Sequence, residues 1–428
     1  MNHQTSVLEN GLRVVTVPLP HLHSAELALY IKVGARNDPP DRLGLSHFLE
    51  HMLFRGTEDF ASSLEIETAF EELGGSVNAA TDSDSTCYYA RIHPTHVPRG
   101  LEILASMALR PKLEGIDLER GIIGEEALED LNEAGEVTSP DLVMGGLLWP
   151  GHPLANPTVG TLADIARIDE KDLRRHAAAW YVPSNAVVTV AGPVQHESVV
   201  AAVTHSFGSW RGPEPACVEL RPPTAAPGPS VVFVQDADSQ VTVQLACHAY
   251  RRSDPRITQL KVLRRVLAGG GCSRLHLALR ERLGLVYAVE SAIGAYDETG
   301  CITIDFSTAP ENLIPVLSAT LDELQSLMVT PLPERELARV RTSYLADLDY
   351  SRDSVTEMGA RYGWGTLMGV VRSIDEDQQL VRTVTAELLR ETAHALFCPQ
   401  NRFLAVIGPI EGIDRQAVEQ VLRGGGAG

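Results

Sequence analysis

No apolar run in this sequence approaches the roughly 18 residues that a membrane-spanning helix needs. The N-terminus also lacks a basic region followed by an apolar segment, so neither a secretory signal nor a transit peptide is indicated. Basic residues are few, with 36 Lys and Arg against 56 Asp and Glu, which gives a net charge of −20. Such an acidic chain repels nucleic acid and anionic membranes. We therefore expect a cytoplasmic protein with no membrane or nucleic-acid partner.

Motifs for disulfides, cysteine-bound metals and nucleotides are missing as well. The six cysteines are scattered without a C-x-x-C pair, which predicts reduced thiols rather than a metal site. The run Gly269-Gly270-Gly271 fits neither the P-loop nor the dinucleotide-binding pattern, and we expect a turn before a helix there. With 44% hydrophobic and 21% charged residues, the chain has the composition of a globular protein with ample core.

The segment His47-Phe48-Leu49-Glu50-His51 carries the clearest chemical signal. It is an H-x-x-E-H motif, the reverse of the more common H-E-x-x-H metallopeptidase signature. On a helix, His47 and His51 project from one face and can bind a single Zn²⁺ through a ring nitrogen each. Glu50 lies beside them and can act as a base on the attacking water without being a ligand. The pattern predicts metal-assisted hydrolysis; the alternative is a solvated helix face that matches by chance.

The flanking residues predict that this motif lies on a helix over 43–54. Pro39-Pro40 blocks helix upstream, and Asp41 is the expected N-cap. Apolar residues at i, i+3, i+4 and i+7 form one stripe, and the motif side chains fall on the opposite side. The stripe consists of Leu45, Phe48, Leu49 and Met52. The helix therefore has one face to bury and another for chemistry.

The chain is an internal repeat of one unit. Segment 181–193 matches segment 397–409, and each enters a strand that ends at Gly-Pro. Asn185 and Asn401 stand 216 residues apart, and the other matched positions keep this offset. Residues 211–229 contain six prolines and two glycines, which is typical of an extended linker. The predicted boundaries are an N-terminal zinc-binding domain over 1–210, a linker over 211–229 and a homologous domain without a metal site over 230–428.

Strand and helix patterns are mixed within each copy. Residues 14–17 and 25–33 have the β-branched, alternating pattern of strands. Helical patterns are expected over 43–54, 64–73, 97–108 and 116–131. Because the strands do not alternate regularly with helices, the sequence predicts an α+β fold. Each of two tandem homologous domains is expected to pack its helices on a largely antiparallel sheet.

A zinc site of this kind needs a third protein ligand, and the first copy is the one that can hold it. In the second copy the motif positions are taken by approximately Lys261, Arg264 and Arg265, which cannot bind zinc. In the first copy, Glu119 and Glu126 lie two turns apart on one face of a helical, acidic segment. A solvated acidic face is the alternative interpretation. On spacing, either Glu119 or Glu126 could be the ligand while the other orients an imidazole N–H. Spacing also does not separate Glu126 from its neighbours Glu125 and Glu129.

These motifs, in this order, resemble the pitrilysin-type inverzincins. That family includes insulin-degrading enzyme, the mitochondrial processing peptidase subunits and short two-domain bacterial peptidases. In the first copy the resemblance is carried by 47–57, Leu73-Gly74-Gly75, Asn78-Ala79, Tyr88-Tyr89-Ala90, Glu119-Arg120-Gly121 and Glu126. In the second copy it is carried by 269–275, 279–281 and 284–287. The resemblance covers nearly the whole chain.

The resemblance implies roles that spacing leaves undecided. It implies that Glu126 is the third zinc ligand and that Glu119 supports the site by orienting an imidazole. It also implies that Arg280 and Tyr287 contact the substrate near the scissile carbonyl, where they would stabilise negative charge. The family's substrates pair with an edge strand of the catalytic domain. Two residues match that strand: Asn78 and Ala79.

We therefore predict a zinc endopeptidase, with one Zn²⁺ per chain, that cleaves peptides or unfolded segments. The family encloses substrate between two clamshell halves and this chain supplies one half, so the resemblance implies a dimer. Because one chain carries both the metal motif and the pair of Arg280 and Tyr287, we expect a homodimer; the alternative is a heterodimer with a related subunit. Two alternatives are a processing peptidase that removes a leader from one precursor, and a scaffold like the family's respiratory-complex core subunits. The scaffold is disfavoured because those subunits have degenerate metal motifs, whereas His47, Glu50, His51 and Glu126 are all present here.

Overall fold

The computed structural model describes residues 3–215, 221–223 and 228–424. These residues form two compact units. The first comprises 3–128, 156–215 and 348–374, and the second comprises 129–155, 221–223, 228–347 and 375–424. The predicted linker over 211–229 lies partly outside the described residues.

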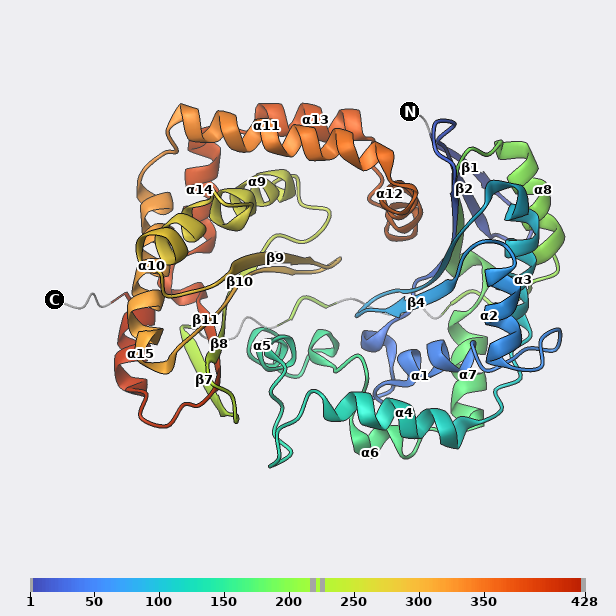
Figure 1. Ribbon diagram of the computed structural model, residues 1–428, viewed down its shortest axis with the longest axis horizontal. Helices are drawn as coiled ribbons and strands as arrows, with labels where there is room; N and C mark the ends of the chain where they lie inside the picture. Colours follow the sequence, from blue (N-terminus) through green and yellow to red (C-terminus); the bar gives the residue numbers. More distant parts are fainter. Residues whose placement is uncertain (1–2, 216–220, 224–227, 425–428) are drawn as a thin grey trace. The chain divides into compact units, whose positions relative to one another are not determined.

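Each unit is built on one β-sheet, and the two sheets share a strand order apart from the additional β1 (Figure 1). The order in the first unit is β1-β2-β6-β3-β5-β4. Its strands are β1 Gln4–Val7, β2 Arg13–Pro18, β3 Ala25–Ile31, β4 Val77–Thr81, β5 Thr86–Ile92 and β6 Ala186–Gly192. The order in the second unit is β7-β11-β8-β10-β9. Its strands are β7 Ser230–Gln235, β8 Val241–Ala249, β9 Val289–Ala295, β10 Gly300–Thr308 and β11 Phe403–Gly408.

Both sheets are largely antiparallel, which confirms the predicted α+β class. In each sheet one pair of neighbouring strands is parallel, namely β2 with β6 and β7 with β11. The other neighbouring pairs are antiparallel. The repeat extends to individual hydrogen bonds. Asn185 Nδ2 donates to the backbone oxygen of Lys32 (3.1 Å), and Asn401 Nδ2 donates to that of His248 (2.9 Å), 216 residues further on.

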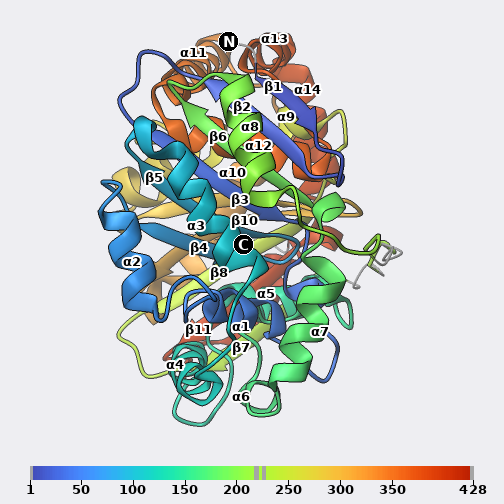
Figure 2. The same ribbon diagram turned by 90° about the vertical axis from the view of Figure 1, so that its right-hand side faces the viewer.

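Helices cover both faces of the first sheet (Figure 2). The helices of this unit are α1 Leu45–Met52, α2 Ser63–Glu71, α3 Val97–Leu109, α4 Ile116–Leu128, α6 Leu162–Ile165, α7 Glu170–Trp180, α8 His196–Phe207 and α12 Val355–Met368. Alternate residues of β3 point to opposite faces, so Leu27 meets α3 whereas Glu26 accepts a hydrogen bond from Thr356 of α12. Helix α12 packs closely, because a Cβ on Gly363 would lie 2.2 Å from Thr189 Oγ1.

The helices of the second unit pack on its sheet or on one another. They are α5 Pro140–Leu148, α9 Ile257–Ala268, α10 Leu313–Val329, α11 Glu334–Tyr350, α13 Ile374–Thr383, α14 Ala386–Leu396 and α15 Arg415–Leu422, together with the π-helix η5 His276–Arg282. On α5, Met144 and Leu148 join an apolar cluster with Phe403 and Ala405 of β11. Within the described part of the chain, no helix is both long and apolar enough to cross a bilayer.

Two helices at equivalent positions of the repeat each pack in the unit that is formed mainly by the other half of the sequence. An offset of 216 residues places α5 on α12 in the repeat. Yet α5, from the first half, belongs to the second unit, and α12, from the second half, belongs to the first. The compact units therefore differ from contiguous domains over 1–210 and 230–428 at segments 129–155 and 348–374. Local patterns do not reveal such an exchange, because one apolar helix face fits either of two homologous sheets.

Candidate metal centre

The motif helix α1 is shielded on both of its sides. Its apolar stripe, including Leu45 and Phe48, is buried in the core of the first unit. His47 and Glu50 are also buried, at 8% and 7% exposure, because α4 and β4 pack against this helix. The helix is two residues shorter at each end than the predicted 43–54. The chemical face of the motif is therefore covered by other elements rather than solvated.

The first turn of α1 is capped by a residue other than the expected one. Asp41 lies 3.0 Å from Arg42 Nη1 and does not cap the helix. The N-cap position is Gly44, whose φ of 87° suits glycine and which has no side chain to donate or accept. Asp38 instead accepts from the backbone N–H groups of Gly44 (2.9 Å) and Ser46 (3.0 Å). The Asp41 prediction was wrong because it assumed a cap adjacent to the helix, whereas the cap comes from six residues upstream of Gly44.

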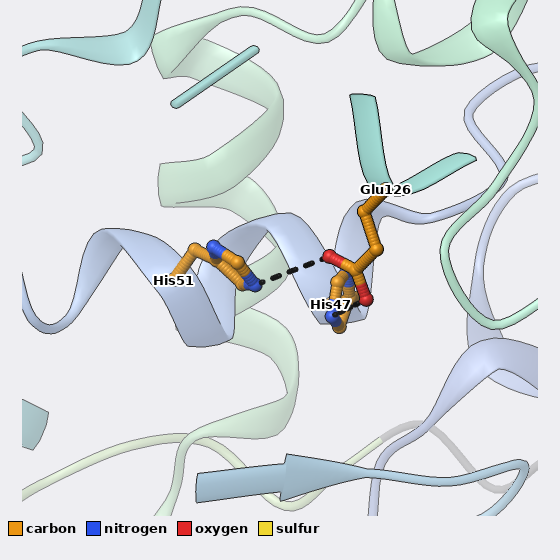
Figure 3. Close-up of side chains that lie close together, drawn as sticks. All are labelled: His47, His51 and Glu126. Atoms are coloured by element: carbon orange, nitrogen blue, oxygen red, sulfur yellow. Dashed lines mark ion pairs between the residues drawn. The ribbon is translucent and has the colours of Figure 1, made fainter. Parts of the chain in front are cut away.

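His47, His51 and Glu126 lie together, as Figure 3 shows. His47 Nε2 is 3.6 Å from Glu126 Oε1, and His51 Nε2 is 3.8 Å from Glu126 Oε2. One ligand atom from each residue lies within 4.8 Å of the others. Tetrahedral coordination with zinc–ligand bonds of about 2.1 Å places neighbouring donor atoms about 3.4 Å apart. The three residues therefore fit a zinc ion, which they would hold through two Nε2 atoms and a carboxylate.

Glu119 fixes the orientation of the His51 ring. Glu119 Oε2 lies 3.1 Å from His51 Nδ1, and Glu119 Oε1 pairs with Arg55. This contact favours a proton on Nδ1 and leaves Nε2 free to bind a metal. Burial lowers the pKa of His51, but the Glu119 hydrogen bond and nearby carboxylates outweigh burial and raise the pKa overall. Burial, with the charge of His51, lowers the pKa of His47 to about 4, which keeps that ring neutral as a ligand must be.

Glu50 is held by a residue that the sequence analysis missed. Thr81, at the end of β4, donates a hydrogen bond from its hydroxyl group to Glu50 Oε2. Burial raises the pKa of Glu50, while the Thr81 hydrogen bond and the charge of His51 oppose that rise. Strand alternation from Val77 places Thr81 on the inner face of β4, so part of the signal was in the sequence. The helix that Thr81 meets could not be predicted, because α1 and β4 are remote in the chain.

The structure separates the glutamates that spacing left open. Glu126 approaches the two histidines, whereas Glu125 is exposed on the same helix and Glu129 lies beyond the end of α4 at Leu128. The counterpart of this centre in the second unit is an ion pair. There Arg265 of α9 lies 2.5 Å from Asp347 of α11. Among the described residues, His47, His51 and Glu126 are the one group with the composition and spacing to hold a metal ion.

Asn78 and Ala79 lie in β4, the terminal strand of the first sheet. Opposite them in β5 are Tyr89 and Tyr88. Among the described strands β4 pairs with β5 alone, so its second edge has backbone groups available to an added strand. The same strand ends at Thr81, which contacts Glu50.

Arg280 and Tyr287 lie in the second unit. Arg280 belongs to the π-helix η5, and its guanidinium carbon is 5.4 Å from the centroid of the Tyr287 ring. Tyr287 is 86% exposed, so this pair lies at the surface of its unit. Contact of either residue with a substrate stays a prediction.

The chain thus combines two similar α+β halves with one group of zinc-type ligands, a donor set that is found in catalytic zinc sites. Family models match adjacent parts of the chain: "Insulinase (Peptidase family M16)" over 13–161 and "Peptidase M16 inactive domain" over 167–344. An uncharacterized zinc protease of Mycobacterium tuberculosis is 30% identical over 411 residues, which cover 94% of this chain and 92% of the relative. The chain therefore belongs to peptidase family M16, and the resemblance inferred from its motifs is confirmed.

Solved structures share this fold. A protease from Helicobacter pylori matches with a TM-score of 0.87 at 20% identity, covering 95% of this chain and 99% of that chain. A chain of complex III2 from Candida albicans matches with a TM-score of 0.78 at 17% identity, covering 97% and 99%. At these identities the likeness shows the fold alone. Because one fold serves both a protease and a complex III chain, function has to be argued from the site.

Proposed function

We propose that this protein is a zinc-dependent endopeptidase that cleaves peptides or unfolded segments. The approach of Glu126 to His47 and His51 carries the proposal, because it completes a three-ligand set from elements far apart in the sequence. When bound, zinc supplies Lewis acidity toward a peptide carbonyl and acidifies water. Membership of a family whose relatives are named zinc proteases supports the same chemistry.

Glu50 is the proposed general base that moves the proton during hydrolysis. It accepts a proton from the water that attacks the carbonyl carbon, and passes it to the amine nitrogen when the C–N bond breaks. Thr81 holds the carboxylate through Oε2, which leaves Oε1 to take the proton. At 7% exposure, Glu50 is largely screened from bulk water that would compete for its proton.

The substrate is proposed to add as a strand to the free edge of β4, beside Asn78 and Ala79. Such pairing reads the peptide backbone, so we expect broad specificity. Arg280 and Tyr287 are proposed to bind the substrate carbonyl, since a guanidinium and a phenol can stabilise negative charge on oxygen. Arg280→Ala should then lower turnover while the zinc content stays unchanged.

A homodimer and a cytoplasmic location are further proposals. The homodimer is supported by the family resemblance, in which substrate is enclosed between two halves of this size. A light-scattering mass near twice 46.4 kDa at micromolar concentration would support it, and a mass near 46.4 kDa would contradict it.

Metal analysis coupled to a peptide-library digest tests the main proposal. The wild-type protein should retain zinc and cut several library peptides. Glu50→Gln should retain zinc yet lose hydrolysis, and Glu72→Gln, which alters an exposed carboxylate in the same unit, should retain both. Cleavage of one dedicated precursor alone would favour the narrower processing role. A wild-type protein that neither retains zinc nor cleaves any peptide would contradict the proposal and favour a scaffold.

A further inference from the structure

A buried polar cluster lies behind the metal-binding helix. It consists of Asp38 at the end of the short helix η1 Ala35–Asn37, Ser46 in α1 and His176 in α7. Their exposures are 6%, 0% and 5%, and the core around them is apolar. Polar groups are buried at a cost unless they are hydrogen-bonded, so each member must have defined partners.

Asp38 accepts hydrogen bonds from backbone N–H groups at the start of α1. Its Oδ2 accepts from Gly44 N–H (2.9 Å) and its Oδ1 accepts from Ser46 N–H (3.0 Å), and the backbone of Leu45 contributes as well. These are the N–H groups that a helix leaves without partners inside itself. A local side-chain cap is impossible, because a Cβ on Gly44 would lie 2.2 Å from the backbone oxygen of Val159.

Ser46 extends the cluster to α7. Its Oγ lies 2.6 Å from Asp38 Oδ1 and 3.0 Å from His176 Nε2. Burial lowers the pKa of His176 to about 4, so the ring is neutral. One arrangement of protons then gives each side chain a hydrogen-bond partner. In it, His176 Nε2–H donates to Ser46 Oγ, and the Ser46 hydroxyl donates to Asp38. Asp38 is thereby held from α7 as well as from α1.

The segment that carries Asp38 is also bonded to the end of β4. Ala35 N–H donates to the backbone oxygen of Asp82 (3.0 Å), and Arg36 N–H donates to that of Ser83 (3.0 Å). These acceptors directly follow Thr81, the partner of Glu50. The segment therefore connects the start of α1 to the strand whose last residue holds the candidate base.

His47 needs such a connection because it lies in the first turn of α1, three residues after the N-cap Gly44. The terminal turns of helices fray unless their free N–H groups are capped. We propose that Asp38 is a positioning residue, which fixes the first turn of α1 and thereby holds His47 and Glu50 in place relative to β4. This inference rests on the proposed zinc peptidase function.

Asp38→Asn tests the inference, because it keeps the shape of the side chain but replaces one acceptor oxygen by an amide NH2 group. That NH2 group would face a backbone N–H of Gly44 or Ser46, so the first turn must shift. Zinc dissociation constants should be measured by chelator competition, and kcat and KM on the folded fraction. We expect zinc affinity and kcat to fall about tenfold each, with KM within about twofold of wild type.

Val203→Ala in α8 is the matched control, because Val203 is fully buried in the same unit, on a helix that packs against α3 and β2. It should lower the melting temperature without changing zinc affinity or kcat. Asp38→Asn with a lowered melting temperature but unchanged zinc affinity and kcat would overturn the inference. If Asp38→Asn does not fold, Ser46→Ala decides by the same criteria, and failure of both to fold would also overturn it. A wild-type protein without zinc or cleavage would instead refute the proposed function.

Discussion

Glu119 Oε2 lies 3.1 Å from His51 Nδ1, so a buried carboxylate sets which nitrogen of this imidazole faces Glu126. Glu119 is 5% exposed and pairs with Arg55 through its other oxygen. Glu119 therefore fixes the orientation of the His51 ring independently of a bound metal. This arrangement is typical of metal sites in which an outer carboxylate orients a histidine ligand.

Glu119→Gln should weaken zinc binding by about 10- to 100-fold, because the ring of His51 loses a charged acceptor and Arg55 loses its partner. Chelator competition measures the change. Asp117→Asn, at a fully exposed position of the same helix, serves as the control and should bind zinc like the wild type. Equal affinities for Glu119→Gln and the wild type would refute the orienting role.

Glu126→Gln should release zinc far more readily than Glu125→Gln, because Glu126 approaches both histidines and Glu125 is exposed. A neutral amide is a poor zinc ligand compared with a carboxylate. Zinc content after dialysis distinguishes the two variants. The reverse order would place the third ligand one residue earlier than the structure does.

Thr81→Val should lower kcat about tenfold while zinc content stays unchanged, because it removes the hydroxyl that orients the Glu50 carboxylate at nearly constant volume. Thr81→Ser keeps the hydroxyl and should retain most of the activity. Steady-state kinetics on a peptide substrate provide the test. A serine variant as slow as the valine variant would point to packing of β4 instead of the hydrogen bond.

The shifted pKa values of Asp38 and His176 predict opposite effects of pH on the free energy of unfolding. Burial raises the pKa of Asp38 from 3.8 to about 7, so the folded protein binds a proton that the unfolded chain releases, and stability falls as pH rises between these values. Burial lowers the pKa of His176 from 6.5 to about 4, so stability falls as pH drops between those values. In the wild type the two effects largely cancel.

Single variants should therefore reveal each effect separately. Relative to the wild type, metal-free Asp38→Asn should lose stability as the pH falls from 6.5 toward 4, since the opposing effect of Asp38 is removed while that of His176 remains. His176→Gln should instead lose stability as the pH rises toward about 7. Denaturant unfolding across this pH range measures both slopes. Slopes of the same sign in the two variants would show that the cluster does not titrate in this way.

Much of the molecule could be predicted from its sequence, because the relevant signals can be read along the chain itself. The H-x-x-E-H spacing and the stripe from Leu45 to Met52 depend on neighbouring residues, and the 216-residue repeat is found by comparing the sequence with itself. They led to the motif helix, the two similar sheets and the family. Glu126 was chosen over Glu125 only through the family resemblance, since both lie on one helix and spacing does not tell which one turns inward.

Only the tertiary structure decided the contacts between segments that are far apart in the chain. Asp38 rather than Asp41 caps the motif helix because a loop folds back over its first turn. Thr81 meets Glu50 because β4 packs against α1, and α5 and α12 are exchanged because each fits a homologous sheet. Periodicity reports which side of an element is buried, but not which remote element covers it. The sequence by itself thus determined the candidate ligands on one helix, and packing decided what holds them in place.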